Sequence, residues 1–204
     1  AILCYQIQLP CIVMGHGLGG TKEMGLDRYA RRFREAGFAV LVFDYRYFGD
    51  SGGEPSHLIW IPDQLDDWAA AIEYARSRPE VDPAQIGLWG TSLSGGHVIT
   101  TAAKDARIGA VSAQCPALDG MAAAQEAMHH SGISAGYLRL IVHAQRDLVR
   151  SWLGLSPHRV PVVGPAGSVA LMALPAAVET FAALAPADYE NEACARIAIR
   201  ADKY

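Results

Sequence analysis

The stretch IGLWGTSLSGGHV at residues 86–98 is an apolar run that stops at a glycine, presents a serine and continues with residues that suit a helix. A serine on a sharp strand-to-helix turn holds its hydroxyl clear of the backbone, and such a turn closes only when the residues two before and two after it are small. Relative to Ser92, these positions hold Gly90 and Ser94. The stretch therefore predicts a strand, a tight turn at Ser92 and a helix, with one mild departure from the G-x-S-x-G pattern of a nucleophile elbow.

Two other interpretations of this stretch stay open. Centring the pattern on Ser94 would place Ser92 and Gly96 at the flanking positions, but Gly90, the glycine nearest the strand end, would then lie outside the turn. Alternatively, Ser92 is only the N-cap of a helix that follows a glycine-rich loop. A short pattern with one mismatch is weakly specific, so the rest of the chain has to decide between them.

The totals describe a globular protein of 204 residues, long enough for a large core. Its 17 basic and 21 acidic residues are interspersed and give a formal charge of −4, which shows neither a nucleic-acid groove nor a basic membrane face. No apolar run reaches the roughly 20 residues that span a bilayer. We therefore expect neither a nucleic acid nor a membrane as a partner.

The four cysteines are widely scattered and form no C-x-x-C pair: Cys4, Cys11, Cys115 and Cys194. In a chain of this size, free thiols in a reducing compartment are a better interpretation than a disulfide framework. We expect a cytoplasmic protein.

Short apolar runs alternate with amphipathic segments over the first half of the chain. The predicted strands are 11–14, 38–43, a run from 86, and 108–115, and the predicted helices are 26–36, 65–75 and a segment ending near 104. Residues 2–9 are expected to form an edge strand that Pro10 closes. Runs this short and uniformly apolar are typical of strands covered on both faces. The fold class is therefore α/β, with a mostly parallel, doubly wound sheet.

From residue 119 the alternation stops. The pattern predicts helices over 121–155, 176–184 and 193–200, with a Pro/Gly tract at 156–168, and no strand is evident.

The loop from Gly15 to Gly20 has two interpretations. It spells G-x-G-x-x-G after a strand, and Asp44 ends the next strand, which is the logic of a dinucleotide site. Five residues separate Gly20 from the following helix, however, so the phosphates would lose the helix N-terminus. In the other interpretation the loop supplies an oxyanion hole, with backbone N–H donors from Leu18 and from Leu93, directly after Ser92.

Taken together, three blocks resemble the α/β-hydrolase superfamily, in the branch of esterases and dipeptidyl-peptidase-like serine hydrolases. They are PCIVMGHGLGG at 10–20, FDYRYFGDSGG at 43–53 and GTSLSGGH at 90–97. The resemblance implies Ser92 as nucleophile and Leu18 and Leu93 as oxyanion donors, with Asp44 as a structural acid. It implies no cofactor and no metal.

The resemblance also implies a domain organisation. Residues 1–118 would be the N-terminal part of the hydrolase core, and 119–204 a helical cap or lid inserted over the active site. The family places its acid and histidine after two further strands that do not appear, so the remainder of the core is expected to be absent. The strand at 108–115 would then be an open edge for another copy or a missing C-terminal segment. His143 and Asp147 are expected to be a helix-stabilising pair rather than displaced members of a triad.

The expected function is hydrolysis of a small-molecule carboxylic ester through an acyl-enzyme at Ser92. A peptidase or amidase of the same fold, a non-catalytic binding domain, and an NAD-dependent oxidoreductase remain as alternatives.

Overall fold

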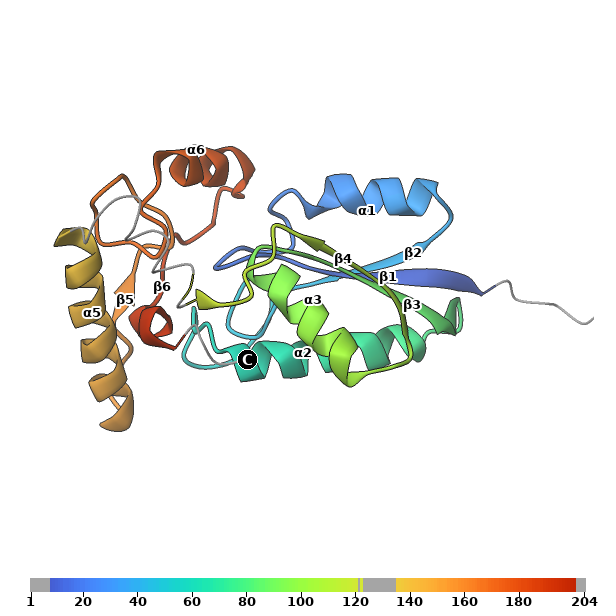
Figure 1. The fold of residues 1–204 in the computed structure, drawn as a ribbon, viewed down its shortest axis with the longest axis horizontal. Coiled ribbons are helices and arrows are strands. Elements are labelled where there is room, and N and C mark those ends of the chain that lie inside the picture. The colour runs from blue at the N-terminus through green and yellow to red at the C-terminus, as the bar shows by residue number, and fades with distance from the viewer. Residues whose placement is uncertain (1–7, 121, 123–134, 201–204) are drawn as a thin grey trace, which may run out of the picture.

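A computed structural model describes residues 8–120, 122 and 135–200 of the chain. Its core is a four-stranded, fully parallel sheet in the order β2-β1-β3-β4 (Figure 1). The strands are β1 (Leu9–Gly15), β2 (Ala39–Phe43), β3 (Val81–Thr91) and β4 (Ile108–Gln114). The parallel sheet predicted from the apolar runs is therefore confirmed.

Helices cover both faces of this sheet. Helix α1 (Leu26–Glu35) lies on one face, and α2 (Ile61–Arg76) and α3 (Leu93–Lys104) lie on the other (Figure 1). Each face has its own apolar core, because side chains of β1 and β3 alternate between the two sides. Leu26 packs with Trp89 on the α1 side, and Trp68 packs with Leu88 on the other. The doubly wound architecture is confirmed.

The start of the sheet differs from the prediction. Leu9 and Pro10 belong to β1, which lies between β2 and β3 and not at an edge, and residues 2–7 of the predicted strand lie outside the described residues. Proline has no N–H to donate to a ladder. The register against β3 accordingly shifts between Leu9, which pairs with Val81, and Cys11, which pairs with Ile86.

The described part of the chain beyond the sheet, residues 135–200, is called the C-terminal region below. It contains α5 (Ala135–Trp152), β5 (Arg159–Val160), α6 (Pro175–Leu184), β6 (Ala193–Cys194) and a 3-10 helix η1 (Ala195–Ile199). The region lies beside the carboxyl ends of the core strands (Figure 1), where Val162 and Ile197 share an apolar cluster with Phe48 and Leu93. Of the helix predicted over 121–155, α5 covers 135–152 and residue 122 is also helical, whereas residues 153–155 lie beyond the end of α5. None of the described helices combines the length and apolarity needed to cross a membrane.

Two predictions for this region are wrong. A two-stranded antiparallel sheet is present, with Arg159 opposite Cys194, and residues 193–200 form β6 and η1 instead of one α-helix. Ala193 and Cys194 are fully buried, so their backbone groups need partners. The Cys194 N–H donates to the His57 carbonyl at 2.8 Å, which ties β6 to the core in an extended conformation.

Asp147 holds the C-terminal region together. Its fully buried carboxylate accepts from the Arg196 guanidinium at 2.7 Å, from the Arg196 backbone N–H at 3.0 Å and from the His158 N–H at 2.7 Å. The expected pairing with His143 is wrong, because the His143 ring instead hydrogen-bonds the His158 ring, Nδ1 to Nε2, at 2.6 Å. Asp147 thereby fixes η1 to α5.

Replacing Asp147 with asparagine should lower the free energy of unfolding by about 3–5 kcal/mol, because a buried guanidinium would lose its counter-charge. Urea unfolding followed by circular dichroism measures this loss. The matched control is Asp27→Asn, which breaks an exposed pair with Arg31 and should cost no more than about 0.5 kcal/mol. Equal losses for the two variants would contradict the structural role of Asp147.

Candidate active site

Ser92 forms the whole turn between β3, which ends at Thr91, and α3, which begins at Leu93. Its backbone has φ 56° and ψ −119°, a conformation that residues with a side chain rarely adopt and that costs about 1–3 kcal/mol. Two backbone hydrogen bonds, both of 2.9 Å, hold the turn: Ser92 donates to the Gln114 carbonyl and accepts from the Ala117 N–H. The strained strand-to-helix turn that the sequence predicts is present.

Three glycines make room for this turn. A Cβ atom at Gly90 would collide with the Ser94 carbonyl oxygen, and one at Gly95 would lie 2.8 Å from the Pro116 Cα. A Cβ atom at Gly17 would lie 3.1 Å from the Ser92 Cβ. The loop after β1 therefore packs closely against the serine, and the start of α3 packs closely against β3 and the segment after β4.

Ser94 stands where the elbow pattern expects a glycine, and a buried network explains its presence. Its side chain is fully buried and its hydroxyl hydrogen-bonds the Tyr45 hydroxyl, which also accepts from the Trp68 indole N–H at 2.7 Å. Ser94 is thus a core residue with no route to a substrate. Of the two serines weighed from the sequence, the geometry favours Ser92.

The loop after β1 has a fixed peptide orientation beside Ser92. The Gly17 carbonyl accepts from the Gly20 N–H at 3.2 Å and from the His16 ring Nδ1 at 3.0 Å. Carbonyl and N–H of a planar trans peptide point in opposite directions, so these bonds also set the direction of the Leu18 N–H. His16 is buried, and burial lowers its pKa, so near pH 7 the ring is neutral with its hydrogen assigned to Nδ1 by this bond. Sequence reasoning placed His16 in the loop but missed this role.

The two predicted oxyanion donors belong to the two segments that meet at the serine, the loop after β1 and the start of α3. Leu93 is the first residue of α3, so its N–H belongs to the positive end of a helix. The Leu18 side chain packs against the apolar cluster that contains Leu93 and Phe48. The structure brings Leu18 and Leu93 together at Ser92, and their catalytic role remains a prediction.

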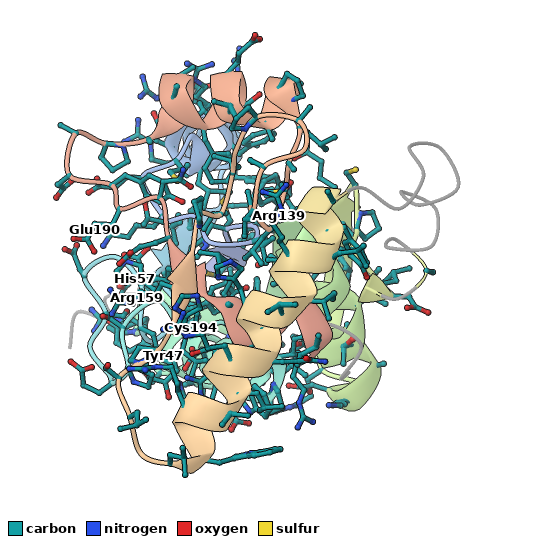
Figure 2. All side chains as sticks on the ribbon, turned by 90° about the vertical axis from the view of Figure 1, so that its left-hand side faces the viewer. Tyr47, His57, Arg139, Arg159, Glu190 and Cys194 are labelled. Carbon is teal, nitrogen blue, oxygen red and sulfur yellow. The ribbon has the colours of Figure 1, made fainter. Side chains whose placement is uncertain are left out.

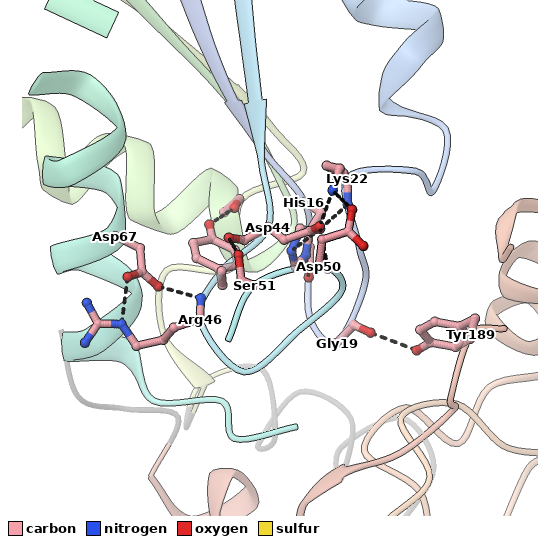
Figure 3. Close-up of polar contacts among 12 residues, drawn as sticks. His16, Gly19, Lys22, Asp44, Arg46, Asp50, Ser51, Asp67 and Tyr189 are labelled. Carbon is pink, nitrogen blue, oxygen red and sulfur yellow. Dashed lines mark hydrogen bonds and ion pairs between the residues drawn. The ribbon is translucent and has the colours of Figure 1, made fainter. Parts of the chain in front are cut away.

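Asp44 is fully engaged in holding this loop (Figure 3). Its carboxylate accepts from the Lys22 backbone N–H at 2.6 Å, the Lys22 ammonium at 2.8 Å and the Asp50 N–H at 3.2 Å. Burial opposes the charged form, but these hydrogen bonds outweigh it and lower the pKa of the carboxyl. Asp44 is thus not free for a ribose hydroxyl, and α1 begins only at Leu26. Both observations count against a dinucleotide site.

No histidine among the described residues hydrogen-bonds the Ser92 hydroxyl. His97 is fully buried, with Nε2 donating to the Gln64 side-chain carbonyl at 2.8 Å. Burial, with a smaller contribution from nearby His16, lowers its pKa to about 3, so it is too weak a base near neutral pH. His129 and His130 lie outside the described residues.

The His97 pKa carries a pH dependence of stability. The His97 ring has a pKa near 6.5 in the unfolded chain and a pKa of about 3 in the folded protein. Stability is therefore lost as the pH falls between these values, by up to about 1.4 kcal/mol per pH unit. In urea unfolding at pH 7, 6 and 5, His97→Gln should show a smaller fall in stability than the parent protein. The same fall in both proteins would contradict the lowered pKa.

His57, Glu190 and Glu192 have the residue types of a metal site, with one ligand atom from each within 4.8 Å of the others. Figure 2 shows His57 and Glu190 beside Arg159. The two ring nitrogens of His57 face different carboxylates, Nε2 at 3.2 Å from Glu190 and Nδ1 at 3.8 Å from Glu192. The Arg159 guanidinium already pairs with Glu192. These contacts favour a network of ion pairs that joins the core to the C-terminal region over a metal-binding site.

A polar hollow of about 310 Å³ lies between the core loops and the C-terminal region. Its lining includes Lys22, Asp50, His57 and Tyr189, but Ser92 is not part of it. The hollow is therefore separate from the serine.

The comparisons with known proteins agree with this geometry. Residues 6–150 match the family model of the X-Pro dipeptidyl-peptidases (S15 family), which is more than half of the chain. The chain belongs to this family. The predicted α/β-hydrolase superfamily and its dipeptidyl-peptidase-like branch are thus confirmed.

Similar proteins extend this result. The chain is 45% identical over 201 residues to the quorum-quenching protein AidA of Acinetobacter baumannii, an alignment covering 98% of this chain and 64% of AidA. It is 36% identical over 110 residues to the thiohydrolase aneE of Aspergillus aculeatus, covering 54% of this chain and 35% of aneE. The crystal structure of the α/β hydrolase GrgF from Penicillium sp. sh18 superposes with a TM-score of 0.77 at 26% identity, covering 97% of this chain and 65% of GrgF. The chain thus spans just under two thirds of AidA and of GrgF.

Proposed function

We propose that the protein is a serine hydrolase in which Ser92 is the nucleophile. The observation that carries this proposal is the backbone of Ser92, strained at φ 56° in a one-residue turn between β3 and α3. Such a turn presents the hydroxyl above the sheet. In the reaction, the Ser92 oxygen bonds to the substrate carbonyl carbon as its proton passes to a base, and the alcohol departs with a proton. Water then hydrolyses the acyl-enzyme and restores the serine.

The Leu18 and Leu93 N–H groups are proposed to stabilise the oxyanion of the tetrahedral intermediates. Each donor of this kind contributes on the order of 3 kcal/mol in the transition state. Support comes from Gly17, whose contact with Ser92 and whose hydrogen-bonded carbonyl place and orient the Leu18 peptide.

The proposed substrate is a small carboxylic ester with an apolar acyl group. The cluster that includes Leu93, Phe48 and Val162 gives the surroundings of the elbow an apolar character. Relatives named as a quorum-quenching protein and as a thiohydrolase support a small molecule over a polypeptide. The second candidate is a peptidase or amidase, which the name of the family favours.

Residues 119–204 are proposed to act as a cap, since the described part of this segment lies at the carboxyl ends of the strands, where open α/β folds bind ligands. The triad acid and histidine are proposed to lie outside the described residues. Strand β4 leaves residues 109–112 exposed and pairs only with β3 among the described strands. Its outer edge is a proposed pairing site for a further segment or a second copy. The three described cysteines are unpaired, which supports a proposed cytoplasmic location.

A substrate panel tests the proposal in the full-length protein that carries this sequence. The panel comprises p-nitrophenyl esters from acetate to decanoate and X-Pro p-nitroanilides, with acyl-enzyme detected by rapid acid quench and intact-mass spectrometry. Ester turnover with acyl mass on the protein is expected. Turnover of anilides alone would favour the peptidase, and no acyl mass with either class would contradict the proposal and leave a non-catalytic binding domain.

A further inference from the structure

The C-terminal region makes a direct hydrogen bond to the loop beside Ser92. The Tyr189 hydroxyl, between α6 and β6, donates to the Gly19 carbonyl at 2.8 Å (Figure 3). The Tyr189 N–H donates to the Pro186 carbonyl at 3.1 Å, and its ring lies 6.0 Å from that of Phe181 on α6. Burial raises the pKa of Tyr189 to about 12, so the hydroxyl keeps its proton at neutral pH. A tyrosine held in this way is a fixed donor.

Its acceptor is held just as closely. Gly19 has φ +61°, and a Cβ atom there would lie 2.6 Å from the Val162 Cγ2. Val162 is fully buried. The next residue, Val163, is held by the Asn191 side chain, which accepts from the Val163 N–H at 3.0 Å and donates to the Val163 carbonyl at 2.9 Å. The C-terminal region therefore contacts Gly19 through both a hydrogen bond and a rigid apolar wall.

The bond from Tyr189 reaches Leu18 through two peptide groups. The Gly19 carbonyl and the Gly20 N–H belong to one peptide, and that N–H donates to the Gly17 carbonyl at 3.2 Å. The Gly17 carbonyl and the Leu18 N–H belong to a second peptide group, the one that joins Gly17 to Leu18. Each hydrogen bond fixes the plane of its peptide, and successive bonds polarise one another. Two hydrogen bonds in series therefore connect Tyr189 to the Gly19–Gly20 peptide and that peptide to the Gly17–Leu18 peptide. This series is called the peptide relay below.

We propose that Tyr189 is a positioning residue for the oxyanion hole, acting through the peptide relay on the Leu18 N–H. The inference rests on the proposed function of Ser92 and adds that the C-terminal region helps to build the catalytic site and does not only cover it. Because the relay acts on a donor used in the transition state, its loss should affect kcat and leave substrate binding unchanged.

The test replaces Tyr189 with phenylalanine in the full-length protein, which keeps the ring beside Phe181 and removes only the donor. We expect kcat for p-nitrophenyl butyrate to fall about tenfold, less than the roughly 10²- to 10³-fold cost of losing an oxyanion donor outright, with KM within about twofold. The matched control is Tyr74→Phe on α2, whose side chain is exposed and takes no part in the relay. Control activity should remain unchanged.

A second measurement separates positioning from folding. Butyl boronic acid adds to the serine oxygen and forms a tetrahedral adduct, so its affinity should fall in parallel with kcat in Tyr189→Phe, at an unchanged melting temperature. A variant with parent-like kcat and boronate affinity would overturn the inference, as would losses explained by a lower melting temperature. Ser92→Ala serves as the reference: if that variant retains full activity, the proposed function itself has failed, whereas an inactive Ser92→Ala with an unaffected Tyr189→Phe removes only the inference.

Discussion

Replacing Ser92 with alanine in the full-length protein should lower ester hydrolysis by about 10⁴-fold or more, because no acyl-enzyme can form. Only catalysis by the oxyanion hole and substrate binding would remain. KM should change little, since the hydroxyl contributes little to ground-state binding. Initial rates with p-nitrophenyl butyrate measure this effect.

The matched control is Ser77→Ala, an exposed serine directly after α2, which should retain parent activity. If Ser92→Ala and Ser77→Ala were equally active, another group would be the nucleophile.

Replacing Gly90 with alanine should both destabilise the protein and slow the acylation of Ser92. The new Cβ atom would meet the Ser94 carbonyl oxygen, and neither group is the flexible end of a side chain. The start of α3 would have to shift, which moves the Ser92 turn. Overpacking of this kind costs about 1–3 kcal/mol or more. The free energy of unfolding and the rate of Ser92 acylation should therefore fall together.

Gly52→Ala is the control for this variant, because nothing lies within 4 Å of its added Cβ and its φ is not positive. It should change stability by less than about 1 kcal/mol and leave acylation intact. A stable, fully reactive Gly90→Ala protein would show that the turn does not need glycine there.

Local patterns allowed much of this structure to be predicted. The spacing of Gly90 and Ser92 predicted the elbow, because the steric limits of a one-residue turn act within a few residues. Uniform apolar runs predicted a parallel sheet covered on both sides. Strand β6 has only two residues, too few to show a periodicity of two, and the sequence pattern there predicts a helix instead.

Contacts between distant residues could not be predicted. Ser94 fits the elbow only because Tyr45, 49 residues away, takes its hydroxyl. Asp147 pairs with Arg196 across 49 residues, although His143 lies one helical turn away from it. Tyr189 reaches Gly19 across 170 residues. The first of these pairs is set by packing within the core and the other two by packing of the C-terminal region, and such long-range packing leaves no local signal in the sequence.

Covalent labelling of the full-length protein with a fluorophosphonate, followed by peptide mass spectrometry, tests directly whether Ser92 is the nucleophile. The proposed role of Ser92 predicts one phosphonylated serine, Ser92, with labelling lost in Ser92→Ala and kept in Ser77→Ala. Labelling at Ser94 or at any other residue, or a protein that hydrolyses esters while Ser92 stays unmodified, would contradict it.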